Sequence, residues 1–328
     1  MSERPLWIEE DQVKGLLSMA AAIDVLDSTY RLQRQGLAGN MSRAHLRENG
    51  SILHAVGGVI AGEGVAGTKT WIHTAGGAAP VLVLFDLEDG GVRAVIEAFA
   101  MGQIRTAATS GLGTRYLARQ ESSTLAVLGT GKQSFTQAEA VICERPIRAI
   151  RLFGRDPERR AATATRMRES FGVEVGEHGD VAETVRGADV ITVITRAEKP
   201  ILFGEMLEPG QHVNAVGSIV PTKLEVSADL VGRCDLVAVD SIPQAEDDAA
   251  ELRAAVEEGL LQWDAVRSLA SLTAPSTSGS RNTDDITLFK ALGIGVSDVA
   301  LGVELLRQVE RSDDDDAVAA PATPRTKS

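Results

Sequence analysis

Short apolar runs alternate with helix-like segments through the second half of the chain. The runs lie at residues 124–128, 148–153, 189–194, 212–216 and 236–239. After the second run, Asp156 and Pro157 mark a helix start, because aspartate caps the first turn and proline suits the first helical position. Strands that alternate with helices in this way predict an α/β fold with a doubly wound parallel sheet.

The first 120 residues follow a different pattern. Residues 10–35 have an apolar face at helical spacing, and residues 103–119 are helix-like again. Between them lie four strand-like segments, at 51–60, 66–74, 80–87 and 92–99. Glu88-Asp89-Gly90-Gly91 separates the last two segments and is typical of a hairpin turn. This part of the chain is therefore predicted to be α+β.

The C-terminal part is predicted to contain helices and a disordered tail. Residues 286–292 and 296–307 are expected to form helices beyond the last strand of the sheet. From Arg311 onward, four consecutive aspartates are followed by a tail rich in alanine, proline and threonine. Such a composition buries too little apolar surface to fold, so residues 311–328 are predicted to be disordered.

Composition narrows the classes of partner. The chain has 328 residues and a formal net charge of -13, which argues against nucleic acid or an anionic membrane as partner. No apolar stretch is long enough to span a bilayer, and the N-terminus lacks a signal-peptide pattern, so we expect a cytoplasmic protein. The two cysteines lack metal-ligand spacing. We therefore expect no metal site and two buried, reduced thiols.

Residues 124–134, TLAVLGTGKQS, join the first apolar run to two glycines and a helix-like segment. A strand, a tight turn and a helix N-terminus in this order bind a dinucleotide pyrophosphate through backbone N–H groups. Gly129 permits the sharp turn, and Gly131 lets the backbone approach a phosphate closely. Ser134 replaces the third glycine of the usual fingerprint, so a strand–turn–helix without a ligand is the alternative. Together with the later strands, the segment predicts a Rossmann-type domain.

The end of the second predicted strand bears on the choice of cofactor. NAD-binding proteins usually carry an acidic residue there, which binds the adenine ribose. This chain has Gly154 and Arg155 instead. Without that carboxylate a 2′-phosphate is not repelled, and the guanidinium can bind it. We therefore predict NADP(H), with NAD(H) as the alternative if Arg155 is only a surface charge.

Several short motifs, in order along nearly the whole chain, resemble the ornithine cyclodeaminase/mu-crystallin family. They are GTKTW (67–71), RTAATS (105–110), LGTGKQS (128–134), HVNAVGS (212–218), KLE (223–225), VAVDS (237–241) and DDITLFKALG (284–293). The resemblance implies a homodimer with two domains in each subunit. Residues 1–121 and 292–328 would form an α+β substrate-binding and dimerisation domain that the C-terminal helices complete. Residues 122–291 would form the dinucleotide-binding domain.

The resemblance implies that Arg43, Lys69 and Arg105 bind a substrate carboxylate, and that Lys69 and Arg105 are catalytic. A guanidinium can hold a carboxylate through two parallel hydrogen bonds. In a chain this acidic, a small anion also needs local positive charge. Taken alone, each of these cations would more often be a solvated surface residue. Lys69 is one candidate for the proton donor, and His54 and His73 are the alternatives.

The resemblance also implies cofactor contacts around the glycine loop and at the ends of later strands. They are Arg105, Thr106, Gly129, Gly131, Lys132, Gln133, Gly154, Arg155, Thr195, Gly217 and Lys223. Thr106 is expected to touch a phosphate with its hydroxyl at a helix N-terminus.

One departure from the family pattern bears on the chemistry. Cyclodeaminases of the family carry an aspartate where this chain has Ile219, and neither isoleucine nor the adjacent Ser218 is a useful base. We therefore expect no carboxylate at the cationic site. The predicted reaction is the NAD(P)H-dependent reduction of an α-imino acid (a ketimine, a cyclic imine, or a 2-oxo acid plus an amine) to an amino acid, or the reverse oxidation. Two alternatives stay open: an ornithine cyclodeaminase that recruits another base, and an NADP-dependent ligand-binding protein with little catalysis.

Overall fold

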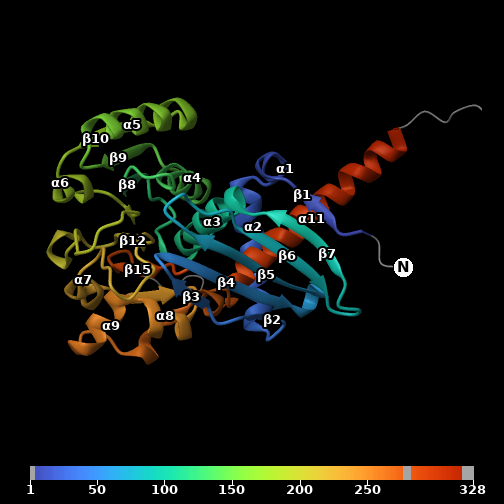
Figure 1. Cartoon of the computed structure of the whole chain (residues 1–328). Helices are drawn as coiled ribbons and strands as arrows, with labels where there is room; N and C mark the ends of the chain where they lie inside the picture. Colours follow the sequence, from blue (N-terminus) through green and yellow to red (C-terminus); the bar gives the residue numbers. More distant parts are fainter. Residues whose placement is uncertain (1–3, 276–281, 320–328) are drawn as a thin grey trace, which may run out of the picture.

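The structure is a computed structural model that describes residues 4–275 and 282–319. Figure 1 shows two lobes, each built around a β-sheet, with the chain passing from one to the other and back. The first lobe holds the N-terminal strands and the final helix, and the second holds the segments between them.

The sheet of the first lobe is mostly antiparallel. Its strands are β1 (Leu6–Ile8), β2 (Ala38–Asn40), β3 (Ala44–Glu48), β4 (Ser51–Ile60), β5 (Val65–His73), β6 (Val81–Asp86) and β7 (Val92–Glu97). Their order is β1-β7-β6-β5-β4-β2, with β3 paired to β4. The β1–β7 pair is parallel and the other pairs among the described strands of this sheet are antiparallel. The predicted hairpin between residues 80 and 99 is confirmed as β6–β7.

Four helices accompany this sheet. They are α1 (Glu10–Leu16), α2 (Met19–Arg34), α3 (Phe99–Leu117) and α11 (Gly295–Ala319), with a short 3-10 turn at Ala61–Glu63. The single helix expected over residues 10–35 is wrong, because the chain is extended at Leu17 and Ser18, and Ser18 caps α2. Its hydroxyl accepts a hydrogen bond from Ala21 N at 3.3 Å, which satisfies one free donor of the first turn.

Helix α11 brings the end of the chain back to the first sheet, where it packs on β4, β5 and β6 (Figure 1). Its first residue lies against β4, since a Cβ on Gly295 would be 2.1 Å from Gly57 N. The helix continues past Arg311 to Ala319. The prediction of disorder from Arg311 onward is therefore wrong for residues 311–319. The remaining tail, residues 320–328, lies outside the described residues.

The second lobe is a fully parallel sheet, which confirms the predicted fold class. Its strands are β8 (Thr124–Leu128), β9 (Ala149–Phe153), β10 (Glu174–His178), β11 (Val190–Val193), β12 (His212–Ala215), β13 (Leu236–Val239), β14 (Arg267–Ser268) and β15 (Thr287–Lys290). They run in the order β10-β9-β8-β11-β12-β15-β13-β14. The helices are α4 (Ser134–Glu144), α5 (Pro157–Phe171), α6 (Val181–Val185), α7 (Ala228–Arg233), α8 (Ile242–Asp248), α9 (Ala250–Glu257) and α10 (Leu269–Leu272), with 3-10 turns at Gly204–Met206 and Trp263–Ala265.

The prediction of a helix over residues 286–292 is wrong. Residues Thr287–Lys290 form strand β15, which lies between β12 and β13 and is buried along its length. A central parallel strand is covered on both faces, so it has no alternation of apolar and polar residues. A short apolar run of this kind cannot be distinguished from a buried helix by its periodicity.

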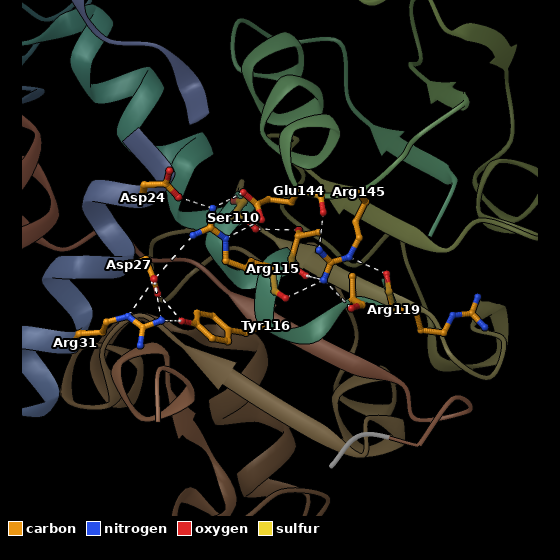
Figure 2. A network of polar contacts seen from close by, with 11 residues as sticks. Asp24, Asp27, Arg31, Ser110, Arg115, Tyr116, Arg119, Glu144 and Arg145 are labelled. Atoms are coloured by element: carbon orange, nitrogen blue, oxygen red, sulfur yellow. Dashed lines mark hydrogen bonds and ion pairs between the residues drawn. The ribbon is translucent and has the colours of Figure 1, made fainter. Parts of the chain in front are cut away.

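Polar contacts join the two lobes where α2, α3 and α4 meet (Figure 2). Arg115 of α3 bonds Asp24 of α2 at 2.7 Å and Glu144 of α4 at 2.8 Å. Arg145, which is 4% exposed, donates to the carbonyls of Thr114, Arg115, Ala118, Arg119 and Glu144. One buried guanidinium therefore binds several of the carbonyl groups at and just after the C-terminus of α3.

Three expectations from composition concern the surface and possible ion sites. Cys143 is exposed and Cys234 is only half-buried, so the prediction of two buried thiols is wrong. Among the described residues, no helix combines the length and apolar content needed to cross a bilayer. Within the same residues, no group of three or more histidine, cysteine, aspartate or glutamate side chains could hold a metal ion.

Candidate active site

The glycine loop follows β8, next to the point where the strand order of the second sheet reverses. In open α/β sheets, ligands bind outside the carboxyl ends of the strands at this point. Gly129 has φ +132, and a Cβ there would lie 2.3 Å from the carbonyl oxygen of Ile194, at the end of β11. A side chain is therefore excluded at Gly129. At Gly131, by contrast, no described atom lies within 4 Å of the Cβ position, so the loop is open on that side.

The residues around the loop fit a dinucleotide. Oε1 of Gln133 is buried and has no hydrogen-bond partner among the described residues, so it is available to a ligand. A Cβ on Gly154 would lie 2.6 Å from Cγ2 of Thr130, which explains the glycine at the end of β9. Arg155 beside it is exposed, whereas the carboxylate of Asp156 is occupied as the N-cap of α5, as predicted. Of the two neighbouring charged residues Arg155 and Asp156, the arginine is therefore the one left available to a ligand.

The first lobe contributes a buried cluster of charges from three elements. Lys69 of β5 and Arg105 of α3 both bond Oδ1 of Asp298 in α11, with Nζ of Lys69 at 2.6 Å and Nε of Arg105 at 3.1 Å. Lys69 is 5% exposed and Asp298 is 1% exposed. Asp298 lies in the first turn of α11, where the helix dipole favours a negative charge. Lys69 and Arg105 are thus brought together, but the expectation that no carboxylate accompanies them is wrong.

The charges of this cluster adjust one another. Burial, helped by the positive charge of Arg105, lowers the pKa of Lys69 to about 8, against the opposing effect of Asp298. Burial by itself would raise the pKa of Asp298, but Arg105 and Lys69 outweigh burial and bring that pKa below its usual range. At neutral pH the cluster therefore holds an ionised Asp298 and a protonated Lys69 that releases its proton more readily than an ordinary lysine.

Arg43, the third predicted cation, lies at the boundary of the two lobes. Its Nη2 donates to the carbonyls of Leu292 and Gly293, at 2.7 and 3.1 Å, in the segment that joins β15 to α11. Its Nη1 lies 3.4 Å from the carbonyl oxygen of Ile219 and 3.7 Å from Oδ2 of Asp248. Nε is buried without a hydrogen-bond partner among the described residues. Most of the guanidinium is therefore bound to the protein itself.

An aromatic wall continues from Lys69 along the same face of the sheet. Nζ of Lys69 lies 5.3 Å from the ring centroid of Trp71, and the ring of His54 stacks on Trp71 at 4.7 Å. Burial lowers the pKa of His54, so this histidine is neutral at pH 7, and its Nδ1 is buried without a partner among the described residues. His73 is exposed at the end of β5.

The other predicted cofactor residues lie at the edges of the two lobes. Thr106 lies two turns inside α3, and its hydroxyl donates to the carbonyl of Gly102 at 2.8 Å, so its expected place at a helix N-terminus is wrong. Lys132 is exposed, with Nζ 5.8 Å from the ring centroid of Phe99 in the first lobe. Thr195, Gly217 and Lys223 all lie in the turns that follow β11 and β12.

Two buried carboxylates near the predicted cations, those of Asp298 and Asp240, were not predicted from the sequence. Asp298 follows the last matched motif by five residues, and Asp240 lies within VAVDS. Oδ2 of Asp240 accepts the backbone N–H groups of Leu292 and Gly293, at 2.9 and 2.6 Å. A charged residue within an otherwise apolar strand end or helix face was the available signal, because such a residue is rarely buried unless it is paired.

The fold and site define a two-lobed protein in which a Rossmann-type sheet in one lobe faces a buried cationic cluster in the other. Residues 9–311 match the ornithine cyclodeaminase/mu-crystallin family, and the chain belongs to this family. It is 36% identical over 220 residues to Delta(1)-pyrroline-2-carboxylate reductase from Bacillus cereus. The matched region covers 67% of this chain and 67% of that protein.

Solved structures show the same fold. A probable ornithine cyclodeaminase from Bordetella pertussis is 27% identical, with a TM-score of 0.88 over 98% of this chain and 100% of that one. Delta(1)-pyrroline-2-carboxylate reductase from Thermococcus litoralis, solved in complex with NADH and L-proline, is 22% identical. Its TM-score is 0.89 over 94% of this chain and 98% of that one.

Proposed function

We propose that this protein reduces an α-imino acid to an amino acid with a reduced nicotinamide dinucleotide, a reaction that can also run in reverse. The observation that carries the proposal is the buried cluster of Lys69, Arg105 and Asp298 in the lobe that faces the glycine loop. The relationship to a pyrroline-2-carboxylate reductase supports the same reaction class.

In this proposal the charges of the cluster bind and orient the substrate. With Asp298 ionised, Lys69 and Arg105 together leave a net positive charge that attracts the substrate carboxylate. The bound cofactor supplies a hydride. An imine accepts hydride best when its nitrogen is protonated, and Lys69, with a pKa of about 8, can donate that proton near neutral pH. Asp298 keeps Lys69 charged and in place, so orientation and proton supply both depend on this pair.

Loss of the cyclodeaminase aspartate is consistent with reduction. Ile219 is 41% exposed, and its backbone carbonyl accepts a hydrogen bond from Arg43. Its side chain provides no group that could accept a proton from a substrate amine. Asp298 does not stand at the position of that aspartate, because it comes from α11 instead of the turn after β12. Lys69 and Arg105 share its Oδ1, and its Oδ2 is buried without a hydrogen-bond partner among the described residues.

For the cofactor we propose NADP(H), with Arg155 as the residue that binds the 2′-phosphate. The support is the exposed guanidinium next to Gly154, and the capping role that occupies Asp156. The Arg155→Ala variant is expected to raise the KM for NADPH by about tenfold and to leave the KM for NADH nearly unchanged. Arg166→Ala, which removes an arginine of α5 that stacks on Phe135, is the matched control. An equal effect of Arg155→Ala on both cofactors would refute this assignment.

We also propose that the protein is a homodimer formed through the outer face of the first sheet. Leu46, Leu53 and Ile72 are aligned across β3, β4 and β5 and are 67%, 48% and 51% exposed. An exposed apolar stripe of this kind favours association with a second copy. Light scattering after size-exclusion chromatography should give the dimer mass for the natural protein and the monomer mass for Leu53→Glu. A monomeric natural protein would contradict the proposal.

The direct test of the reaction is a panel of cyclic imino acids and of 2-oxo acids with amines, each assayed with NADH and with NADPH. We expect cofactor oxidation with at least one α-imino acid. Activity should be lost in Lys69→Ala and Arg105→Ala. Release of ammonia from ornithine without net cofactor oxidation would instead identify a cyclodeaminase. Saturable binding without turnover across the panel would identify a binding protein.

A further inference from the structure

A second buried cluster of charges lies beneath the turns that follow β11 and β12. Glu225, Glu251 and Lys290 come from the segment before α7, from α9 and from the end of β15, and each is at most 1% exposed. Nζ of Lys290 donates to Oε1 of Glu251 at 3.2 Å and to the backbone carbonyl of Ser218. Burying three ionisable groups is costly unless their hydrogen bonds are well made, so this arrangement calls for a reason.

Glu225 ties the two turns together. Its Oε1 accepts both the backbone N–H and the hydroxyl of Thr195, each at 2.6 Å, and its Oε2 accepts the backbone N–H of Ser218 at 2.8 Å. The fit is close, because a Cβ on Gly217 would lie 2.5 Å from Oε1 of Glu225 and 2.3 Å from the carbonyl oxygen of Thr195. The relative position of the two turns is therefore set by one carboxylate.

Lys290 fixes the second turn from the other side. It holds the carbonyl of Ser218, while the hydroxyl of Ser218 donates to the carbonyl of Lys223 at 2.5 Å. In the turn from Gly217 to Lys223, buried charged groups therefore bind both backbone groups of Ser218. Glu225 accepts its N–H and Lys290 donates to its carbonyl.

The location of these turns gives the cluster its role. The glycine loop for the pyrophosphate follows β8, and β11 and β12 are the next strands in the sheet. A dinucleotide that crosses the carboxyl ends of the strands with its pyrophosphate at β8 has its nicotinamide half over these turns. We propose that Glu225 and Lys290 are positioning residues that hold the Thr195 and Ser218 turns in the geometry that binds the nicotinamide half of the cofactor. This inference rests on the proposed function for the identity of the cofactor.

The variants Glu225→Gln and Lys290→Met test the inference in the full chain. Glutamine has nearly the same volume but only one acceptor oxygen. Its amide NH2 group, which is a donor, must therefore face the backbone N–H of either Thr195 or Ser218, which is also a donor. Binding of NAD(P)H and of the corresponding ADP-ribose, which lacks nicotinamide, is measured separately by calorimetry. We expect both variants to weaken NAD(P)H binding by about tenfold and to change ADP-ribose binding by less than about twofold.

Glu144→Gln is the matched control, because it removes a carboxylate that is also mostly buried and ion-paired but lies at the junction of the lobes. It should alter neither affinity. If Glu225→Gln weakens the binding of NAD(P)H and of ADP-ribose equally, or weakens neither, the inference is overturned. If Lys290→Met does not fold, the result for Glu225→Gln alone decides. If the natural protein binds NAD(P)H but reduces no imine, the proposed function is refuted. The comparison of NAD(P)H binding with ADP-ribose binding in the variants still tests the inference in that case.

Discussion

Replacing Asp298 with asparagine tests whether this carboxylate keeps Lys69 protonated. The substitution preserves shape but removes the negative charge 2.6 Å from Nζ of Lys69 and 3.1 Å from Nε of Arg105. Two positive charges then face each other without a counter-ion in a buried site. Because a nearby like charge disfavours the charged form of a lysine, the pKa of Lys69 should fall.

The size of the change follows from the geometry. Unit charges about 4 Å apart interact by about 4 kcal/mol at an effective dielectric constant of about 20. Rearrangement of Arg105 and of water will offset part of this energy, so we expect at least one third of it to remain, which corresponds to a shift of about one pKa unit. The pKa of Lys69 would then fall from about 8 in the natural protein to about 7 or lower in the variant.

The assay is the pH dependence of kcat/KM for imine reduction, which reports ionisations of the free enzyme and free substrate. Protonated Lys69 is present below its pKa, so activity of the natural protein should decline as pH rises through about 8. In Asp298→Asn the decline should begin about one unit lower. The ionisation of the substrate contributes equally to both profiles, so their difference reports on Lys69. Glu144→Gln should leave the profile unchanged, and a decline at the same pH in Asp298→Asn would refute the reasoning.

Three further substitutions test other parts of the structure. Lys69→Met should lower kcat/KM by a factor of about 100 or more, because the variant loses the side chain that binds the substrate and donates the proton. Cofactor affinity should change little, and a loss in kcat/KM below about tenfold would contradict the role of Lys69. Gly129→Ala should abolish cofactor binding and lower the melting temperature, because its Cβ would meet the carbonyl of Ile194 at positive φ; unchanged calorimetric binding would contradict this. Arg145→Met should lower the free energy of unfolding in urea by about 3 kcal/mol, because the carbonyls at the end of α3 lose their donor. The exposed Arg148→Met is its control, and an equal effect of both would refute the capping role.

The sequence predicted the elements whose chemistry is local. Strand β4 has the predicted bounds, the helix after β9 begins at the Asp156 cap, and the glycine loop joins β8 to α4. Each of these depends on neighbouring residues: an apolar run, a cap, or a glycine that must turn sharply. Strand β15 was missed because its environment is set by β12 and β13 on either side, which a local pattern does not contain.

The site was predicted in part for the same reason. The motifs around Lys69 and Arg105 identified the two cations, but their shared partner Asp298 lies 229 and 193 residues further along the chain. Only the return of α11 to the first sheet brings that carboxylate to the cations. The same limit applies to Glu225 and Lys290, which were part of matched motifs but had no assigned contact until the sheet order placed them together.

The most direct measurement of the central claim is the fate of the hydride. The protein is supplied with pyrroline-2-carboxylate and with NADPH or NADH that carries deuterium at both hydrogen positions of C4 of the nicotinamide. The amino acid formed is analysed by mass spectrometry and NMR. We predict proline with one deuterium at Cα, formed in equal amount to the cofactor oxidised. Unlabelled proline, or no proline, from pyrroline-2-carboxylate would contradict the account. So would a parallel reaction with ornithine that yields proline and ammonia without net consumption of reduced cofactor.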